Sequence, residues 1–334
     1  MLQPFSAPRH LGSHAAWWHP AYQDRRWTPG PPVRIIDTMT TTPRPAPPQA
    51  ELAAFLRAKR ARLQPEDVGL PRGPRRRTPG LRRQEVAQLA AVSVEWYVRL
   101  EQGRVGTPGA AVLDALADAL RLTPDEARHL RLLARRESRH TAPAAGPDRQ
   151  VRSSLRQLLY GIPLFPAYLT DHRLDVLAHN AAARALFGAG FGTGRADNTA
   201  RTLFLDPVAR ADQLDWQRIA RETVGHLRAG HARHPGDPRM AALVAELRSR
   251  SSEFDTWWTD HTVLERSTGS KRVRHPEAGE LRLHYDILST GPATDHLLFT
   301  VTPADTATEH ALRRLVTAHT TRTAGTTVHP INAA

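Results

Sequence analysis

The stretch LRRQEVAQLAAVSVEWYVRLEQGR, residues 81–104, decides the fold of the first half of the chain. Val86 and Leu89 recur at helical spacing in its first part and predict the apolar stripe of one short helix. In its second part, a helix that turns about 100° per residue puts Tyr97 and Leu100 on one face. Only a tight turn fits between the two helices. The pattern therefore predicts a helix-turn-helix, a motif whose second helix enters the major groove of DNA.

The outward face of the second helix is polar. It carries Glu95, Val98, Arg99 and Gln102. Trp96 lies at the flank, where it either seals the edge of the core or rests near a sugar-phosphate backbone. Neither aromatic side chain of the helix is expected to read bases.

Helical periodicity extends to both sides of this motif. ELAAFLRAKRARL before it, and VLDALADALRL and TPDEARHLRLLARRE after it, predict further helices, so that residues 51–139 hold five short helices. The pairs Thr78–Pro79 and Thr123–Pro124 each match a helix start, with Thr as the N-cap and Pro at the first helical position.

Charge is uneven along the chain. The 334 residues carry a net charge of +13. Residues 51–140 hold 18 Lys and Arg against 11 Asp and Glu, or +7, whereas residues 151–320 hold 21 against 19, or +2. A compact basic domain beside a nearly neutral one predicts a polyanion-binding module, although a generally Arg-rich proteome would give the same excess.

The sequence contains no Cys, which excludes disulfides, thiolate metal sites and Cys nucleophiles. No apolar run is long enough to span a bilayer, and the N-terminus lacks the pattern of a signal peptide. We therefore expect a cytoplasmic, nucleoid-associated protein without membrane insertion.

After residue 150 the pattern is mixed. VRSSLRQLLY and AAARALFG predict helices, and residues 212–266 are mostly helical in period. PAYLTDHRLDVLAHN alternates like two strands around an Asp-His turn, and GELRLHYDILST with DHLLFTVTPA predicts a later strand pair. Helices inserted between two strand pairs predict an α+β sheet domain.

Pro-rich and Gly-rich segments mark the borders of these regions, because they cannot form a packed core. The expected organisation is a disordered lead-in at 1–48 with Met39 as an alternative start, a helix-turn-helix domain at 49–139, a linker at 140–150, an α+β domain at 151–318 and a disordered tail at 319–334.

The stretch at 81–104 and the closing helix VLDALADALRLTPDE resemble the Xre-type, phage-repressor-like helix-turn-helix family in core spacing, turn length and the terminal RLEQGR. The resemblance implies an all-α, five-helix, lambda-repressor-like DNA-binding domain. One departure is Ala91, which occupies a turn position where the family usually has Gly, favoured there for its positive φ.

The resemblance also assigns contacts with double-stranded DNA by position. It places Val94, Glu95 and Arg99 at base-facing positions. Arg99 is the candidate for a bidentate guanine contact, Glu95 either accepts from a cytosine amino group or is only solvated, and Val94 lies against a thymine methyl. The expected contacts to the DNA backbone are Arg75, Arg76, Arg77, Arg82, Arg83 and Ser93. For the arginines of the run RGPRRRTPGLRR, a solvated loop is the alternative.

Four segments of the second half resemble, in order, the MmyB-like ligand-binding domain of actinobacterial helix-turn-helix regulators. They are PAYLTDHRLDVLAHNAAARALFG, NTARTLFLDPVARADQLDWQRIARETVGHLRAG, DPRMAALVAELRSRSSEFDTWWTDHTV and GSKRVRHPEAGELRLHYDIL. His179 stands where the familiar form of the first segment has Trp. The resemblance implies a PAS-like fold, an antiparallel sheet with helices around an apolar cavity that holds a small hydrophobic, fatty-acid-like ligand and requires no cofactor.

Either Arg274 or His275 is expected to meet the head of such a ligand, and apolar residues to line its cavity, although the same aromatic side chains would serve equally well as core. The expected pocket residues are Phe187, Leu203, Phe204, Trp257, Trp258, Arg274 and His275.

Three hypotheses for function remain from the sequence. The chain is a ligand-responsive regulator that binds DNA as a homodimer, or its C-terminal domain is only a dimerisation or protein-interaction module, or that domain is an enzyme. GAGFGTG lacks the spacing of a dinucleotide-binding loop, and His226, His231 and His234 have no acidic or Cys ligand to complete a metal site. We therefore expect neither catalytic residues nor a metal.

Overall fold

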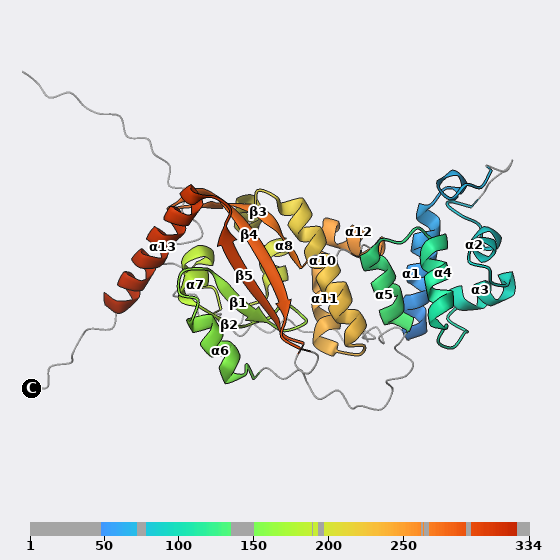
Figure 1. Cartoon of the computed structure of the whole chain (residues 1–334), viewed down its shortest axis with the longest axis horizontal. Coiled ribbons are helices and arrows are strands. Elements are labelled where there is room, and N and C mark those ends of the chain that lie inside the picture. The colour runs from blue at the N-terminus through green and yellow to red at the C-terminus, as the bar shows by residue number, and fades with distance from the viewer. Residues whose placement is uncertain are drawn as a thin grey trace, which may run out of the picture.

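The computed structural model describes residues 48–71, 78–134, 150–188, 190–192, 197–261, 263, 267–291 and 295–325 (Figure 1). Within these ranges, a helical N-terminal part precedes a part in which helices pack on one antiparallel sheet. Several expectations lie outside the described residues: Met39 with nearly all of the lead-in, Arg75, Arg76 and Arg77, and most of the linker at 140–150. No helix in the described ranges is long and apolar enough to cross a membrane.

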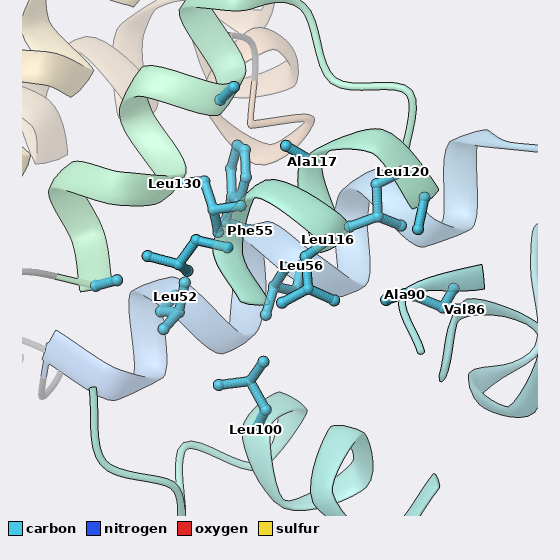
Figure 2. Packing of buried hydrophobic residues seen from close by; sticks show 14 of the residues in the cluster. Leu52, Phe55, Leu56, Val86, Ala90, Leu100, Leu116, Ala117, Leu120 and Leu130 are labelled. Carbon is cyan, nitrogen blue, oxygen red and sulfur yellow. The ribbon is translucent and has the colours of Figure 1, made fainter. Parts of the chain in front are cut away.

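The N-terminal part is built around its first helix. Its elements are α1 (Pro48–Arg62), the 3-10 turn η2 (Pro65–Val68), α2 (Arg83–Leu89), α3 (Val94–Glu101), α4 (Ala110–Ala119) and α5 (Pro124–Ala134). Figure 2 shows the core of this part. Phe55 and Leu56 of α1 are fully buried there, together with Leu100 of α3, Leu116 of α4 and Leu130 of α5. The first helix therefore supports both α3 and α5.

Side-chain hydrogen bonds define the first turns of α3 and α5. The Oγ of Ser93 accepts from the N–H of Trp96 at 3.1 Å. The N–H of Thr123 donates to Glu126 Oε2 at 2.9 Å, and the N–H of Glu126 donates back to Thr123 Oγ1 at 3.3 Å. Since α5 begins at Pro124, the start predicted from the Thr-Pro pair is confirmed.

The helix start predicted at residues 78–79 is wrong. The helix α2 begins at Arg83, and Gly80 before it has φ +72°. A Cβ on Gly80 would lie 2.3 Å from the carbonyl oxygen of Arg60, and the N–H of Leu81 donates to that same oxygen at 3.0 Å. The chain turns here against α1, in a conformation that favours Gly, so the helix begins only after the crossing.

The turn between α2 and α3 contains the positive φ expected there. Ala91 has φ +52°, which an alanine adopts at a modest cost. The expected role of Leu89 in the core is wrong, because its side chain is 36% exposed. Instead Val86, Ala87 and Ala90 form the buried face of α2. These positions are spaced i, i+1 and i+4, and Leu89 lies outside that face.

The C-terminal part forms a five-stranded antiparallel sheet with the strand order β2-β1-β5-β4-β3. Its elements are α6 (Ser153–Tyr160), β1 (Ala167–Thr170), β2 (Val176–His179), α7 (Ala181–Phe187), α8 (Thr199–Leu205), α9 (Pro207–Asp212), α10 (Trp216–Arg233), α11 (Pro238–Arg250), α12 (Ser252–Thr259), β3 (Thr268–His275), β4 (Gly279–Ser289), β5 (Leu297–Pro303) and α13 (Thr306–Gly325).

Both predicted strand pairs are present, as β1 with β2 and β4 with β5. The strand β3 was missed, because TGSKRVRH places polar residues on both faces and shows no apolar alternation. The last helix, α13, continues to Gly325, past the domain end expected at residue 318.

Helices cover the two faces of the sheet unequally. On the inner face, Leu283 and Tyr285 of β4 pack in a cluster with α7 and α13. On the outer face, α6 packs on Leu169 of β1 and Leu298 of β5. The same face is open at β4, where Arg282 is exposed. The larger apolar core between the sheet and its helices therefore lies on the inner face.

A second group of helices packs beside the sheet and reaches the N-terminal part. The helices α8, α10, α11 and α12 share a core that contains Phe204, Trp216 and Phe254. Ala232 of α10 and Val263 belong instead to the apolar core of the N-terminal part. The two parts of the chain thus meet through a common core, in addition to the connection between α5 and α6.

Candidate DNA-reading helix and ligand-binding region

The exposed face of α3 carries the residues expected to read bases. Glu95 and Arg99 are exposed, and Val94 is half-buried at the start of the helix. Tyr97 is fully buried, as its place on the inner face predicted. Trp96 is half-buried and packs against the edge of the core.

A buried carboxylate fixes α3 to the two preceding helices. Glu101, at the end of α3, is 1% exposed. Its Oε1 lies 2.6 Å from Arg60 Nε of α1, and its Oε2 lies 2.7 Å from Arg83 Nε of α2. Burial by itself would raise the pKa of the Glu101 carboxyl, but the hydrogen bonds from Arg60 and Arg83 outweigh it, so that the pKa is lowered. The helix α3 is therefore held by charge as well as by apolar packing.

Two of the residues expected at the DNA backbone, Arg82 and Arg83, lie at an open hollow at the start of α2. Arg60, Thr78, Arg82, Arg83 and Gln84 line it. The Arg83 side chain remains 46% exposed while it pairs with Glu101. Arg60 is buried on Glu101, so the exposed guanidinium groups of Arg82 and Arg83 are the ones that suit a phosphate contact here.

The role of Glu101 was not predicted, although its signal is present in the sequence. Tyr97, Leu100 and Glu101 are spaced i, i+3 and i+4, which puts them on one helix face. A carboxylate on a buried face needs cationic partners, because an unpaired buried charge is unstable. The partners, Arg60 and Arg83, are separated from it in sequence and could not be identified without the fold.

The residues expected to line a ligand pocket fall into separate groups. Leu203 and Phe204 of α8 pack in one cluster with Trp257 and Trp258 of α12. The rings of Phe204 and Trp257 lie 6.3 Å apart. Phe187 of α7 belongs to the other cluster, on the inner face of the sheet.

The indole of Trp216, which was not among the predicted pocket residues, belongs to the cluster of Phe204 and Trp257. The Nε1 of Trp216 donates to the carbonyl oxygen of Leu203 at 2.8 Å. Its ring lies 5.8 Å from that of Phe204 and 5.8 Å from that of Trp257. The guanidinium of Arg210 covers the Trp216 ring at 3.7 Å. Trp216 therefore closes this aromatic cluster toward the surface.

The two polar candidates for a ligand head point in opposite directions. Arg274 is exposed, whereas His275 is 3% exposed. Neighbours on a strand face opposite sides of a sheet, so they cannot both face one cavity. The Nε2 of His275 lies 3.2 Å from the carbonyl oxygen of Ala185, and burial lowers its pKa. The structure thus does not bring Arg274 and His275 together.

Charged side chains connect α1 to the C-terminal part. The Nζ of Lys59 lies 2.9 Å from Glu126 Oε1 and donates to the carbonyl oxygen of His261 at 2.8 Å. From the other side, Nη1 of Arg228 in α10 lies 3.1 Å from Nδ1 of His261. Arg228 also donates to the carbonyl oxygen of Trp258, and its guanidinium lies 4.4 Å from the Trp258 ring.

Aromatic and ionic contacts extend this interface. The ring of Phe55 in α1 lies 5.3 Å from that of His129 and 6.2 Å from that of His261. Nε2 of His231 in α10 lies 2.7 Å from Glu51 Oε1 of α1. The interface therefore contains three histidines among buried charges.

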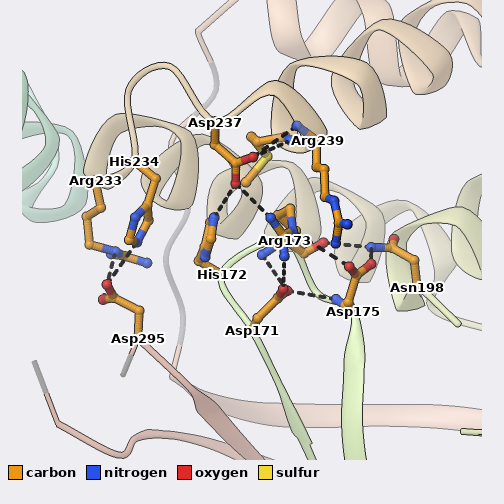
Figure 3. A network of polar contacts seen from close by, with 11 residues as sticks. Asp171, His172, Arg173, Asp175, Asn198, Arg233, His234, Asp237, Arg239 and Asp295 are labelled. Carbon is orange, nitrogen blue, oxygen red and sulfur yellow. Dashed lines mark hydrogen bonds and ion pairs between the residues drawn. The ribbon is translucent and has the colours of Figure 1, made fainter. Parts of the chain in front are cut away.

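A buried polar network fixes the turn between β1 and β2 (Figure 3). Arg173 is 2% exposed, and its guanidinium lies 2.6 Å from Asp171 Oδ2 and 2.9 Å from Asp237 Oδ2. Asp237 also pairs with His172 at 2.8 Å and caps α11. Asn198 donates to the carbonyl oxygen of Arg173 at 2.7 Å. The network ties the early hairpin to α8 and α11.

Two stacked histidines extend the network toward β5. The rings of His172 and His234 lie 3.8 Å apart at 27°, and Nε2 of His234 lies 2.8 Å from Asp295 Oδ2. Across the described ranges, no three His, Cys, Asp or Glu side chains are gathered as a metal site requires. His231 and His234 instead have separate carboxylate partners.

Two known protein families match the chain. A helix-turn-helix domain family matches residues 51–130, and the MmyB-like transcription regulator ligand binding domain matches residues 151–315. No curated protein matches the chain. The protein is thus a helix-turn-helix transcription regulator. Within that class, it belongs to the regulators with a C-terminal MmyB-like ligand-binding domain.

Proposed function

We propose that this protein is a sequence-specific DNA-binding regulator that responds to a small hydrophobic, fatty-acid-like ligand in its C-terminal domain. Val94, Glu95 and Arg99 read bases in the major groove, and the arginines at the start of α2 with Ser93 contact phosphates. The regulator binds as a homodimer to two half-sites about one helical turn apart.

Three further assignments belong to this proposal. The N-terminal domain is of the Xre type, supported by the positive φ at Ala91 in a short turn between two helices. The C-terminal domain is PAS-like, supported by an antiparallel sheet that carries helices on its inner face. The protein acts in the cytoplasm at the nucleoid, without an enzymatic role.

The observation that carries the proposal is the path of contacts between the aromatic cluster and α1. Trp258 belongs to the aromatic group in α12 and is in contact with Arg228 of α10. Arg228 contacts His261, and the carbonyl oxygen of His261 accepts from Lys59 of α1 at 2.8 Å. A ligand that displaces Trp258 would therefore act directly on the first helix of the DNA-binding domain.

The same helix fixes the recognition helix. Arg60, the neighbour of Lys59, pairs with Glu101 at the end of α3. A shift of α1 is thus transmitted to α3 without passing through the linker between α5 and α6. For such coupling, the ligand must bind the two arrangements with different affinity.

The proposal is tested with the purified full-length chain. Solvent extraction with mass spectrometry identifies any bound small molecule, and selection from a random pool supplies the DNA site. We expect dodecanoate, a fatty-acid probe, to raise the melting temperature and to change the affinity for that site, measured by fluorescence anisotropy. An empty protein with no response would support the alternative, in which the domain serves only dimerisation or protein interaction.

One variant separates binding from coupling. Lys59→Met removes the bond to His261, while Arg62 Nη1 still pairs with Glu126 at 2.8 Å. We expect this variant to retain the melting-temperature shift with dodecanoate and to lose the change in DNA affinity. Arg128→Met, at an exposed position of α5, is the matched control and should retain both responses.

A further inference from the structure

The inner face of β3 carries a lysine whose ammonium group lies against aromatic rings. The Nζ of Lys271 lies 5.3 Å from the centre of the Phe187 ring and 5.9 Å from that of Tyr285. Among the described residues, Lys271 has no hydrogen-bond or ion-pair partner. Its pKa is lowered to about 8, mainly by burial and to a smaller extent by Arg218, while Glu222 acts in the opposite direction. An ammonium group held this way against aromatic rings is poised to accept an anion.

A second polar group faces the same side of the sheet. Tyr168 of β1 pairs in register with Phe299 of β5, and Tyr285 of β4 pairs with Gly269 of β3. Alternation along the strands therefore puts Tyr168, Tyr285 and Lys271 on one face. The Tyr168 hydroxyl has no hydrogen-bond partner in the part of the chain that the structure describes, and burial raises its pKa.

Aromatic rings connect these two groups. Phe187 contacts both of them, with its ring 5.7 Å from that of Tyr168. Phe191 lies 5.2 Å from Tyr168, and Phe299 stacks on Tyr168 at 4.8 Å. Phe187, Phe191 and Phe299 are only partly buried, although they lie on the covered face of the sheet. The three rings thus lie next to Lys271 and the Tyr168 hydroxyl without being fully buried.

We propose that Lys271 binds the carboxylate head of the ligand, with the Tyr168 hydroxyl as a second donor and the Phe187, Phe191 and Phe299 rings around the first methylenes. The inference rests on the proposed ligand-binding function and assigns the head to Lys271 instead of Arg274 or His275. It specifies the ligand class as an amphiphile with one negative charge.

The neighbouring charges favour one negative charge over two. Glu222 of α10 accepts from the Tyr285 hydroxyl and pairs with Arg218 at 3.1 Å. Gly269 leaves room for this Tyr285 hydroxyl, since a Cβ there would lie 2.5 Å from it. Because Glu222 already lies near Lys271, a doubly charged phosphate head would be repelled more than a carboxylate.

Binding should also be linked to the protonation of Lys271. The groups that face it are Glu222 and Arg218 of α10, Tyr285 of β4, and the ring of Phe187. Between about pH 6 and pH 8 the empty site carries the positive charge and the carboxylate is ionised, so affinity for a carboxylate is constant. Above that pH a proton must be taken up on binding, and affinity falls by up to about tenfold per pH unit.

The test compares dodecanoate with 1-dodecanol, which has the same chain and a neutral head, by calorimetry on the delipidated full-length protein. We expect the wild type to bind dodecanoate at least about tenfold more tightly, as a hydrogen bond to a charged group implies. Lys271→Met should lose this preference while its affinity for dodecanol is unchanged, and Tyr168→Phe should weaken it. Arg274→Met, on the outer face of the same strand, should behave as the wild type.

Each other outcome has a definite meaning. Unchanged dodecanoate preference in a folded Lys271→Met variant, or its loss in Arg274→Met, overturns the assignment to Lys271. Equal binding of both probes by the wild type also overturns it, yet leaves the proposed sensing of a hydrophobic ligand standing. If neither probe binds and no small molecule is extracted, the proposed function fails, and this inference fails with it.

Discussion

Glu101 and Arg60 form a buried ion pair, with 2.6 Å between Oε1 and Nε, that joins the end of the recognition helix to the first helix of the fold. Their side chains are 0% and 10% exposed. Such a pair costs desolvation, and it contributes mainly by fixing one arrangement of the helices.

Removing one partner of this pair should destabilise the protein strongly. Glu101→Gln leaves the Arg60 guanidinium buried without its counter-charge, and we expect a loss of about 3 kcal/mol or more in the free energy of unfolding. Urea unfolding of the full-length chain measures it. Glu95→Gln on the exposed face of α3 is the control, expected within about 0.5 kcal/mol. Equal effects of the two variants would contradict the role of Glu101.

DNA selection should separate base reading from phosphate contact. Arg99→Ala should relax preference at one base position, at a cost of about 1–3 kcal/mol for the preferred site. Arg82→Ala should weaken binding to all sequences and reduce the salt slope by about one. The measurement is fluorescence anisotropy at several salt concentrations. An unchanged footprint and affinity for Arg99→Ala would refute the assignment of α3 as the reading helix.

The interface between the two parts should weaken in acid. Burial lowers the pKa of His129 and of His261 to about 3, whereas the unfolded value is about 6.5. Because the folded pKa is the lower one, the contribution to stability is complete above about pH 6.5 and is lost as the pH falls from there toward 3. For His129 alone, the loss between pH 7.5 and 5 is about 2 kcal/mol.

His129→Leu isolates this effect from other titrating groups. The Nδ1 of His129 is buried without a hydrogen-bond partner among the described residues, so leucine forfeits no bond there. Relative to the wild type, the variant should gain about 2 kcal/mol of stability on going from pH 7.5 to 5. A stability difference that stays constant across this range would show that His129 does not titrate as expected.

Among the described glycines of the DNA-binding part, Gly80 should be the hardest to replace. Its φ is +72°, and a Cβ added there would lie 2.3 Å from the Arg60 carbonyl oxygen, so Gly80→Ala should cost more than about 2 kcal/mol. Gly109→Ala is the matched control, because a Cβ there meets nothing within 4 Å. Thermal unfolding of both variants decides the point, and similar melting temperatures would exclude the proposed crowding.

Local chemistry explains which parts of the fold were predictable. The caps of α3 and α5, the positive φ of Ala91 and the inward face of Tyr97 depend on neighbours within one helical turn or one tight loop. The start of α2 was not predictable, because it depends on where the chain crosses Arg60 in α1.

The polar residues of the ligand region were harder to predict, because the residue types alone do not show which side of the sheet each one faces. Arg274, His275 and Lys271 all lie in TGSKRVRH, and the register against β4 alone decides which of them faces inward. The covered face of β3 carries Lys271 and His275, and Arg274 lies on the other. The pairing of β3 with β4 was needed to decide which face of the sheet each residue lies on.

Lys59 and Arg60 are consecutive residues of α1, yet one is bonded to the C-terminal part and the other to the recognition helix. The unit that can be exchanged between related regulators therefore does not end at the junction between α5 and α6. A chimera joined there would combine a foreign first helix with His261 and Arg228 of this C-terminal part, and the proposed path from that part to α3 would be broken.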